Sequence, residues 1–180
     1  MYESGAYVAA ALEAAGAELT ADQRQPNGVD LTADAVFEPV EPGWIGRDGK
    51  RVGDRRALSP RPAPPETDGA GGAASSESGD SAGNTPAYRL DPGTYVVRYG
   101  EPVRIPDGHV GFVYPRSTLL RNAAMLDTAV WDAGYEGVGE GRLHVGHPIA
   151  IEPGARIAQL VLARADHDGT YDGAYQSERL

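Results

Sequence analysis

The sequence predicts a mainly β fold, either a jelly-roll-like sandwich or a distorted small β-barrel, with one short N-terminal helix. Two observations support this prediction. Short apolar segments of strand character recur at regular spacing in the second half of the chain, and Asp-Pro-Gly, Pro-Asp-Gly and Glu-Pro-Gly triplets, which favour tight turns, separate them. Many short strands joined by Gly/Pro turns are typical of antiparallel sandwiches, jelly rolls and barrels.

The first 52 residues predict one helix, one long strand and one hairpin. Residues 4–16 place apolar side chains near helical spacing and end at Gly16, so we expect an amphipathic helix there. A turn at residues 25–28 leads into a strand that is expected to run to about Val40. Residues 41–52 then predict a hairpin with an Asp-Gly turn.

Residues 59–87 differ in composition from the rest of the chain. They are mostly Pro, Gly, Ala, Ser and acidic residues, with no large apolar side chain. Such a segment cannot bury enough apolar surface to offset its conformational entropy, so we expect a disordered insertion. Strand signals flank it on both sides, and long surface loops cost little free energy. The 180 residues are therefore expected to form a single domain interrupted by this loop.

The second half of the chain supplies most of the predicted strands and ends in a tail. We expect a mobile C-terminal tail from about residue 166, because glycines, charges and exposed aromatics replace the strand pattern there. The strands are expected at residues 95–99, 109–114, 128–131, 142–145, 148–151 and 156–162.

Charge and composition exclude several classes of function. The formal net charge is -10, the sequence pI is about 4.8, and Lys50 is the only lysine among 16 basic residues. This surface lacks the basic footprint of a nucleic-acid-binding protein. It fits a protein that stays soluble at high salt, where screening removes most of the self-repulsion.

The absence of cysteine excludes disulfides, thiolate metal sites and cysteine nucleophiles. No run of residues approaches the roughly 18 apolar positions of a membrane span, and the first residues lack a secretory signal. We therefore expect a soluble cytoplasmic protein with no membrane partner.

Residues 115–121, Pro-Arg-Ser-Thr-Leu-Leu-Arg, predict an anion-binding turn. They concentrate two guanidinium groups and two hydroxyls at the start of a one-turn helix, which suits a polyphosphate. The candidate ligands are Arg116, Ser117, Thr118 and Arg121. The alternative is a surface turn whose arginines pair with nearby acids.

Residues 132–137, Asp-Ala-Gly-Tyr-Glu-Gly, place a carboxylate and an aromatic ring at a bend between apolar segments. Asp132 is suited to orienting and deprotonating a water molecule, and Tyr135 to stacking on a base or a sugar. The alternative is an ordinary turn with a tyrosine in the core. The acidity of the chain requires that any triphosphate site be locally positive.

Two further segments complete the candidate site. Residues 156–161 alternate polar and apolar side chains, which places Gln159 with Ile157 and Val161 on one face; its amide can read a pyrimidine edge or satisfy loop backbone. The tail carries Tyr171 and Gln176 in a Gly-containing segment, which can close over a ligand or pack against a neighbouring subunit.

The sequence predicts no metal site built from protein ligands alone. The four histidines, at positions 109, 144, 147 and 167, lack the spacing of a zinc site, and no P-loop of the G-x-x-x-x-G-K-[ST] form occurs. If a divalent ion takes part, we expect Mg²⁺ that arrives with substrate phosphates.

Five motifs, taken in order, resemble the dCTP deaminase and dUTPase family, and its archaeal dUTPase branch in particular. They cover most of the chain outside residues 59–87: Gln25-Pro26-x-x-x-Asp30-Leu31, Pro115-Arg116-Ser117-Thr118-Leu119-x-Arg121, Trp131-Asp132-Ala133-Gly134-Tyr135-Glu136-Gly137, Arg156-Ile157-Ala158-Gln159-Leu160 and Tyr171-x-Gly173-x-Tyr175-Gln176.

The resemblance implies a dUTPase-like homotrimer with active sites at subunit boundaries and a deoxynucleoside triphosphate as substrate. It implies that Asp132 lies near the sugar and the reacting water, with Tyr135 beneath the deoxyribose. The remaining implied substrate contacts are Arg116, Ser117 and Arg121 on the triphosphate, Gln159 at the nucleotide, and Tyr171 and Gln176 closing over it.

Two chemistries occur in the family that the chain resembles: dUTPases hydrolyse the bond between the α and β phosphates with Mg²⁺, and deaminases act on the cytosine ring. Deaminases use a glutamate on the strand after the Asp-x-Gly-aromatic turn, and here His144 aligns best with that position, with Glu140 as a possible substitute. The family's tail usually carries a lysine where this chain has Ala174; Arg179 and Arg164 are candidate replacements.

We therefore expect a Mg²⁺-dependent dUTP diphosphatase with Asp132 and Arg121 as its catalytic residues. The alternatives are a dCTP deaminase, either monofunctional or bifunctional, and a non-catalytic nucleotide-binding β-trimer.

Overall fold

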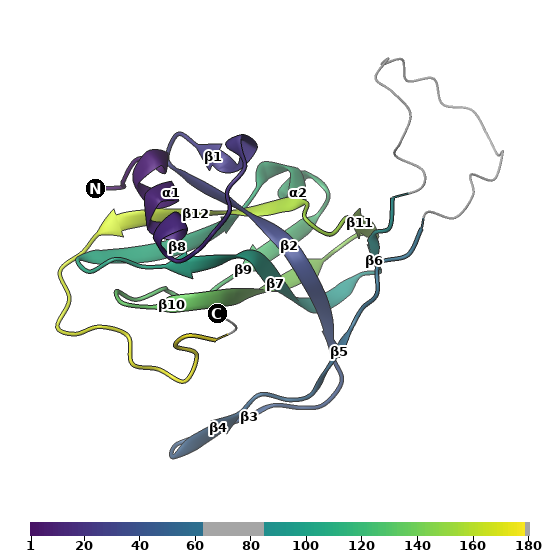
Figure 1. The fold of residues 1–180 in the computed structure, drawn as a ribbon. Helices are drawn as coiled ribbons and strands as arrows, with labels where there is room; N and C mark the ends of the chain where they lie inside the picture. The colour runs from purple at the N-terminus through teal and green to yellow at the C-terminus, as the bar shows by residue number, and fades with distance from the viewer. Residues whose placement is uncertain (63–84, 179–180) are drawn as a thin grey trace.

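The structure, a computed structural model, describes residues 1–62 and 85–178 and confirms a mainly β fold with a short N-terminal helix (Figure 1). The elements are α1 (Gly5–Ala14), the 3-10 helix η1 (Ala21–Gln23), β1 (Arg24–Gln25), β2 (Gly28–Pro39), β3 (Trp44–Gly46), β4 (Gly49–Arg51), β5 (Arg55–Ala57), β6 (Tyr88–Leu90), β7 (Gly93–Arg104), β8 (His109–Pro115), α2 (Ser117–Arg121), β9 (Ala124–Asp127), β10 (Glu136–Val145), β11 (Ile149–Ile151) and β12 (Arg156–Arg164).

One antiparallel sheet organises the described residues. Its strands follow the order β8-β12-β2-β7-β10-β9, and β1 and β5 also pair with β2. The two longest strands, β2 and β7, lie at the centre of this order and are paired along Ala33–Phe37. β2 matches the predicted strand closely, whereas β7 continues past the predicted end at Tyr99 to Arg104, with Val103 buried on its inward face.

The N-terminal helix forms where the sequence predicts it. The Ser4 side chain accepts a hydrogen bond from the Tyr7 amide, which caps the helix start, and Gly16 follows the helix end with φ of +91°, a conformation that favours glycine. Val8 and Leu12 are fully buried and pack α1 against the sheet. None of the helices in the described residues is long and apolar enough to cross a membrane.

The two ends of the strand order meet, so that the sheet is nearly closed into a barrel. β8 and β9 lie next to each other, and the Thr128 hydroxyl donates to the carbonyl of Val113. Trp131 and Gly111 exchange two backbone hydrogen bonds, with N···O distances of 2.8 and 3.2 Å. This pairing fixes the segment that directly precedes Asp132.

The prediction of a strand at residues 128–131 is wrong. The strand in this region is β9, which begins at Ala124, and only Trp131 of the predicted segment forms a bridge. The reason is the burial pattern: Ala124 and Leu126 point inward with Met125 exposed between them, whereas Val130 is exposed. The apolar character of residues 129–130 therefore does not reflect strand pairing.

The predicted hairpin is present as β3 and β4, which project away from the sheet (Figure 1). Its turn is formed by Arg47 and Asp48, one residue earlier than the expected Asp-Gly pair. Residues 63–84 of the expected insertion lie outside the described residues. At its two borders Arg61 and Ala87 pair as a backbone bridge, and Ala87 is buried.

Within residues 1–62 and 85–178, one buried side-chain hydroxyl lacks a hydrogen-bond partner. Tyr99 on β7 is fully buried beneath Trp131, and within the described residues its oxygen forms no hydrogen bond. Burial raises the pKa of this phenol far above its usual range. An unsatisfied buried polar group of this kind costs free energy of folding.

We expect Tyr99→Phe to raise the free energy of unfolding by about 1 kcal/mol, because it removes a desolvated hydroxyl without removing a hydrogen bond. Urea denaturation followed by circular dichroism measures the change. The matched control is Tyr88→Phe, whose hydroxyl donates to the carbonyl of Asp34 at 2.8 Å and whose loss should destabilise the fold. Equal destabilisation by both variants would contradict the assignment.

Candidate functional site

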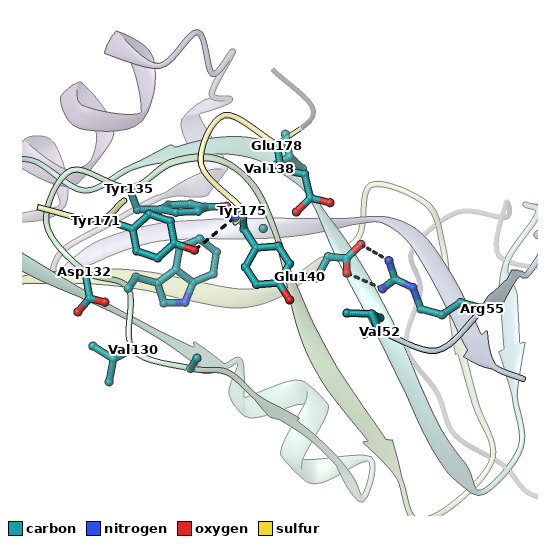
Figure 2. A pocket seen from close by; sticks show the side chains of 13 residues that line it. Val52, Arg55, Val130, Asp132, Tyr135, Val138, Glu140, Tyr171, Tyr175 and Glu178 are labelled. Atoms are coloured by element: carbon teal, nitrogen blue, oxygen red, sulfur yellow. Dashed lines mark hydrogen bonds and ion pairs between the residues drawn. The ribbon is translucent and has the colours of Figure 1, made fainter. Parts of the chain in front are cut away.

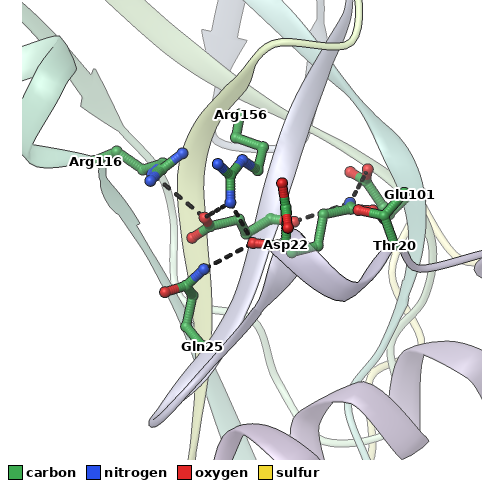
Figure 3. A network of polar contacts seen from close by, with 8 residues as sticks. Thr20, Asp22, Gln25, Glu101, Arg116 and Arg156 are labelled. Carbon is green, nitrogen blue, oxygen red and sulfur yellow. Dashed lines mark hydrogen bonds and ion pairs between the residues drawn. The ribbon is translucent and has the colours of Figure 1, made fainter.

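The first part of the candidate site is a buried ion cluster, which we call the arginine cluster: Asp30, Arg116 and Arg156. The Asp30 carboxylate, only 2% exposed, lies on β2, and one of its oxygens is 3.3 Å from Nε of Arg116 and 3.5 Å from Nη1 of Arg156. Figure 3 shows both guanidinium groups approaching from neighbouring strand ends. Two cations around one carboxylate leave a local excess of positive charge.

Asp30 lies in an unusual electrostatic environment. Burial raises the pKa of its carboxyl above the usual range, and the charges of Arg116 and Arg156 oppose that rise. The two guanidinium groups are each about one third exposed, so that the solvent-facing side of the cluster is cationic. An anion can reach this side without displacing Asp30.

A hydrogen-bonded network supports the cluster from behind (Figure 3). The amide of Gln23 donates to the backbone carbonyl of Asp30 at 3.1 Å and to the carboxylate of Glu101 at 2.6 Å. The same carboxylate accepts from both the hydroxyl and the backbone amide of Thr32, each at 2.8 Å. The network fixes the backbone of β2 at Asp30 and at Thr32.

The predicted anion-binding residues begin at Arg116, which belongs to this cluster, and continue into α2. Arg116 is the N-cap of α2, and Ser117, Thr118 and Arg121 belong to that helix, where all three are exposed. Gln159 is half-buried on β12, directly opposite Asp30 in the strand register, and therefore belongs to the same region. The strict alternation predicted for residues 156–161 is interrupted by a register shift between Arg156 and Ala158.

The second part is a cavity of about 520 Å³, which we call the aromatic pocket. Trp131 forms its floor. Its indole ring packs directly on Gly139 of β10, where a Cβ atom on residue 139 would lie only 1.9 Å from the ring. The ring of Tyr135 stands edge-on to Trp131, with ring centroids 5.1 Å apart. Asp132 is exposed at one end of the pocket (Figure 2).

The tail, residues 166–178, forms the roof of the aromatic pocket. The ring of Tyr171 covers Tyr135 at 5.4 Å, and Tyr175 lies beside it over the pocket (Figure 2). The Gln176 side chain donates to the carbonyl of Gly134 at 2.9 Å and accepts from the amide of Glu136 at 3.3 Å. Tyr171 and Gln176 therefore pack on residues 132–137 of their own chain.

The aromatic pocket is acidic rather than basic. It is lined by three carboxylates, from Asp132, Glu140 and Glu178, and by one guanidinium, that of Arg55. Arg55 binds both carboxylate oxygens of Glu140, at 2.5 and 3.3 Å, at the end of the pocket away from Asp132 (Figure 2). The pocket suits an uncharged or weakly polar group, and a polyphosphate needs a separate cationic region.

A single chain does not bring the two parts of the site together. Arg116 follows the end of β8, whereas Trp131 pairs with Gly111 near its beginning, and five residues of extended strand span about 16 Å. The residues that line the aromatic pocket include Asp132, Tyr135 and Tyr171 but neither Arg116 nor Arg121.

The two candidates for the position of the deaminase glutamate, His144 and Glu140, both lie on β10. Glu140, Arg142 and His144 alternate with buried residues and share one face of the strand. Glu140 lines the aromatic pocket, whereas Arg142 pairs with Asp127, and His144 lies further along the strand outside the pocket lining. Of the two candidates for the acid position, the structure places Glu140 at the pocket.

Sequence reasoning assigned no role to Asp30, Arg156, Arg55 or Glu101. A signal for Asp30 exists, because this acid interrupts the apolar run Val29–Ala33, and a charge in a buried strand needs a partner. No comparable signal exists for Arg55, since its partner Glu140 is 85 residues away in the chain. Within residues 1–62 and 85–178, no three His, Asp or Glu side chains cluster as metal ligands.

Comparison with known proteins gives a consistent result. A family model described as dCTP deaminase-like matches residues 4–165. A probable deoxyuridine 5'-triphosphate nucleotidohydrolase of Halobacterium salinarum is 51% identical over 179 residues, which are 99% of this chain and 96% of the relative. A relative of the same name from Aeropyrum pernix is 39% identical over 162 residues, 87% of this chain and 86% of that protein.

A solved structure supports the fold independently. The crystal structure of 2'-deoxycytidine 5'-triphosphate deaminase from Agrobacterium tumefaciens superposes with a TM-score of 0.63 at 18% identity. The match covers 91% of this chain and 48% of the other, so that the chain spans about half the length of that protein. At this identity the likeness concerns the fold alone.

The raised pKa of Asp30 predicts an unusual pH dependence of stability. Between the unfolded-state pKa and the higher folded-state pKa, the folded chain binds more protons, so that this group's contribution to the unfolding free energy falls as pH rises. Asp30→Asn removes this contribution. We expect the stability difference, wild type minus variant, to decrease with rising pH above about 4 in urea titrations; an increase would contradict it.

Proposed function

The chain belongs to the dCTP deaminase-like family, and we propose that it hydrolyses dUTP to dUMP and pyrophosphate. The observation that supports this proposal most is the aromatic pocket, which offers Tyr135 for a nucleoside and the exposed Asp132 carboxylate at its end. Two relatives that cover most of the chain carry the name of this activity. We assign the reaction to the cytoplasm, as part of deoxynucleotide metabolism.

The active enzyme in this proposal is a homotrimer. The acidic aromatic pocket cannot hold four phosphate charges, and the arginine cluster lies about 16 Å away along β8. Exposed apolar side chains lie on segments between the two parts: Tyr114, Leu120, Met125 and Val130. Burial of this patch against a neighbouring subunit would bring the cationic region of one chain to the aromatic pocket of the next.

The two parts then divide the substrate between them. The nucleoside occupies the aromatic pocket, with its sugar against Tyr135 and the tail as the roof. Arg116, Arg121 and the hydroxyls of Ser117 and Thr118 bind the triphosphate, while Gln159 lies alongside. Because Asp30 already holds Arg116 in place, this donor is fixed before charge develops, which is the condition for strong electrostatic stabilisation.

Asp132 acts as the general base in this mechanism. Its carboxylate takes a proton from a water molecule while the water oxygen bonds to the α-phosphorus. The bond between that phosphorus and the bridging oxygen breaks, and pyrophosphate leaves. Negative charge grows on the bridging and non-bridging oxygens, where Arg116 and Arg121 compensate it.

Mg²⁺ is the metal ion that this proposal requires, and it would be bound mainly by the phosphates. Asp132 is the exposed carboxylate near their expected path and offers the oxygen ligands that Mg²⁺ prefers. When bound, the ion would supply charge neutralisation on the phosphates.

Hydrolysis is favoured over deamination by the state of Glu140. A deaminase needs a carboxyl group beside the cytosine ring that is available to transfer protons. Both carboxylate oxygens of Glu140 are instead bound to Arg55. A non-catalytic nucleotide-binding trimer would release neither pyrophosphate nor ammonia, so product analysis distinguishes it from both enzymes. Incubation with dUTP and with dCTP, each with Mg²⁺, should yield pyrophosphate from dUTP and no ammonia from dCTP.

We expect Asp132→Asn to lower kcat by about 10²- to 10⁴-fold, because it removes the general base but preserves size. The dissociation constant for a non-hydrolysable dUTP analogue should change little, since the Asp132 side chain is exposed and asparagine has nearly the same shape. Steady-state release of pyrophosphate and calorimetric titration measure the two quantities. Retention of full turnover would rule out Asp132 as the base.

Mixing two inactive variants tests the composite site. Arg121→Ala and Asp132→Asn each remove one part, and both side chains are exposed, so that folding should be preserved. Trimers reassembled from an equal mixture should recover about a quarter of wild-type activity, because that share of sites receives both intact parts. A site contained in one chain would recover none.

A further inference from the structure

We propose that Lys50, on the β3–β4 hairpin, is a positioning residue that holds the tail closed over the aromatic pocket through the ring of Tyr175. The kinetic part of this proposal rests on the proposed function, whereas the contact itself rests on geometry. Lys50 is the only lysine of the chain, and its Nζ lies 4.8 Å from the centroid of the Tyr175 ring.

The foot of the hairpin is already part of the aromatic pocket. Val52 and Arg55, which follow β4, line the cavity. Arg55 is held on two sides, by the Glu140 carboxylate and by the ring of Phe37, whose centroid is 4.9 Å from the guanidinium carbon. The hairpin therefore rises from a rigid wall of the pocket.

The tail is anchored on the opposite side of the pocket. The Tyr171 amide donates to the carbonyl of Ala133 at 2.7 Å, and the Ser177 amide donates to the carbonyl of Glu136 at 2.8 Å. Between these two anchors the Tyr175 amide lies 3.4 Å from the Tyr171 hydroxyl. The Tyr175 ring is partly exposed and faces the hairpin, where Lys50 meets it.

The register of the hairpin directs Lys50 toward the tail. Lys50 is paired with Ile45, and the two side chains share one face, whereas Trp44 and its partner Arg51 share the other. The Trp44 ring packs on Gly46 and Gly49 of its own hairpin. Within the described residues Lys50 forms no ion pair, so that its charge is available to the aromatic ring.

A cation within about 6 Å of a tyrosine ring centroid is attracted to the ring face. At an exposed site this attraction corresponds to about a two- to fivefold change in an equilibrium constant. Lys50 therefore favours the closed tail over the open tail by that factor. Because Lys50 does not touch the reacting atoms, its loss should act on nucleotide retention and not on the chemical step.

The test compares Lys50→Ala with two matched variants of the full chain. Lys50→Arg keeps a cation that can lie over the ring, and Arg47→Ala removes an exposed cation from the turn of the same hairpin. Hydrogen–deuterium exchange of residues 171–178 without nucleotide should be about two- to fivefold faster in Lys50→Ala and near wild type in the other two.

A mutant cycle identifies the ring as the partner. Tyr175→Leu should accelerate exchange as Lys50→Ala does, Tyr175→Phe should not, and the double variant Lys50→Ala/Tyr175→Leu should add nothing further. Additive effects of the two single changes, or equal acceleration by Arg47→Ala, would overturn the proposal. These outcomes do not depend on whether the chain hydrolyses dUTP.

The kinetic arm uses dUTP and Mg²⁺. Lys50→Ala should raise KM by about two- to fivefold with kcat unchanged or higher, and Lys50→Arg should restore KM. A lower KM in Lys50→Ala would mean that the contact holds the tail in an inhibitory position and would overturn the assigned role. If the wild type itself releases no pyrophosphate, the proposed function fails, while the exchange measurements still decide the contact.

Discussion

The backbone pairing of Trp131 with Gly111 is the constraint on which the candidate site depends. It ties the segment after β9 to β8, and so nearly closes the sheet and fixes the position of the next residue, Asp132. The indole ring then turns inward over Gly139, and this forms the floor on which Tyr135 and the tail pack. Sheet closure and the pocket floor consequently depend on the same residue, Trp131, and a bulky side chain at Gly139 would displace its ring.

Most of the fold could be predicted from the sequence because its signals are local. The helix cap at Ser4, the glycine that follows the helix, and the turn triplets each act within a few residues. The strand expected at residues 128–131 was wrong because apolar composition alone does not distinguish an exposed connecting segment from a paired strand. The partner of a strand lies far away in the chain, and no local pattern reports it.

The candidate site was predictable as a set of residues but not as an arrangement. Motif order identified Arg116 and Asp132, and the structure adds that a single chain holds them apart. The pairing of Arg55 with Glu140 and the contact of Lys50 with Tyr175 join residues more than 80 positions apart, so that spacing could not reveal either. Long-range side-chain contacts depend on strand register, which composition does not determine.

The burial of Asp30 determines how its ion pair with Arg116 responds to salt. In molar electrolyte the Debye length shrinks to about 3 Å, and the exposed pairs that decorate an acidic surface, such as Arg142 with Asp127, lose most of their attraction. A carboxylate sealed between strands is shielded from mobile ions, so its hold on Arg116 persists. High salt would therefore weaken the exposed ion pairs much more than the pair of Asp30 with Arg116.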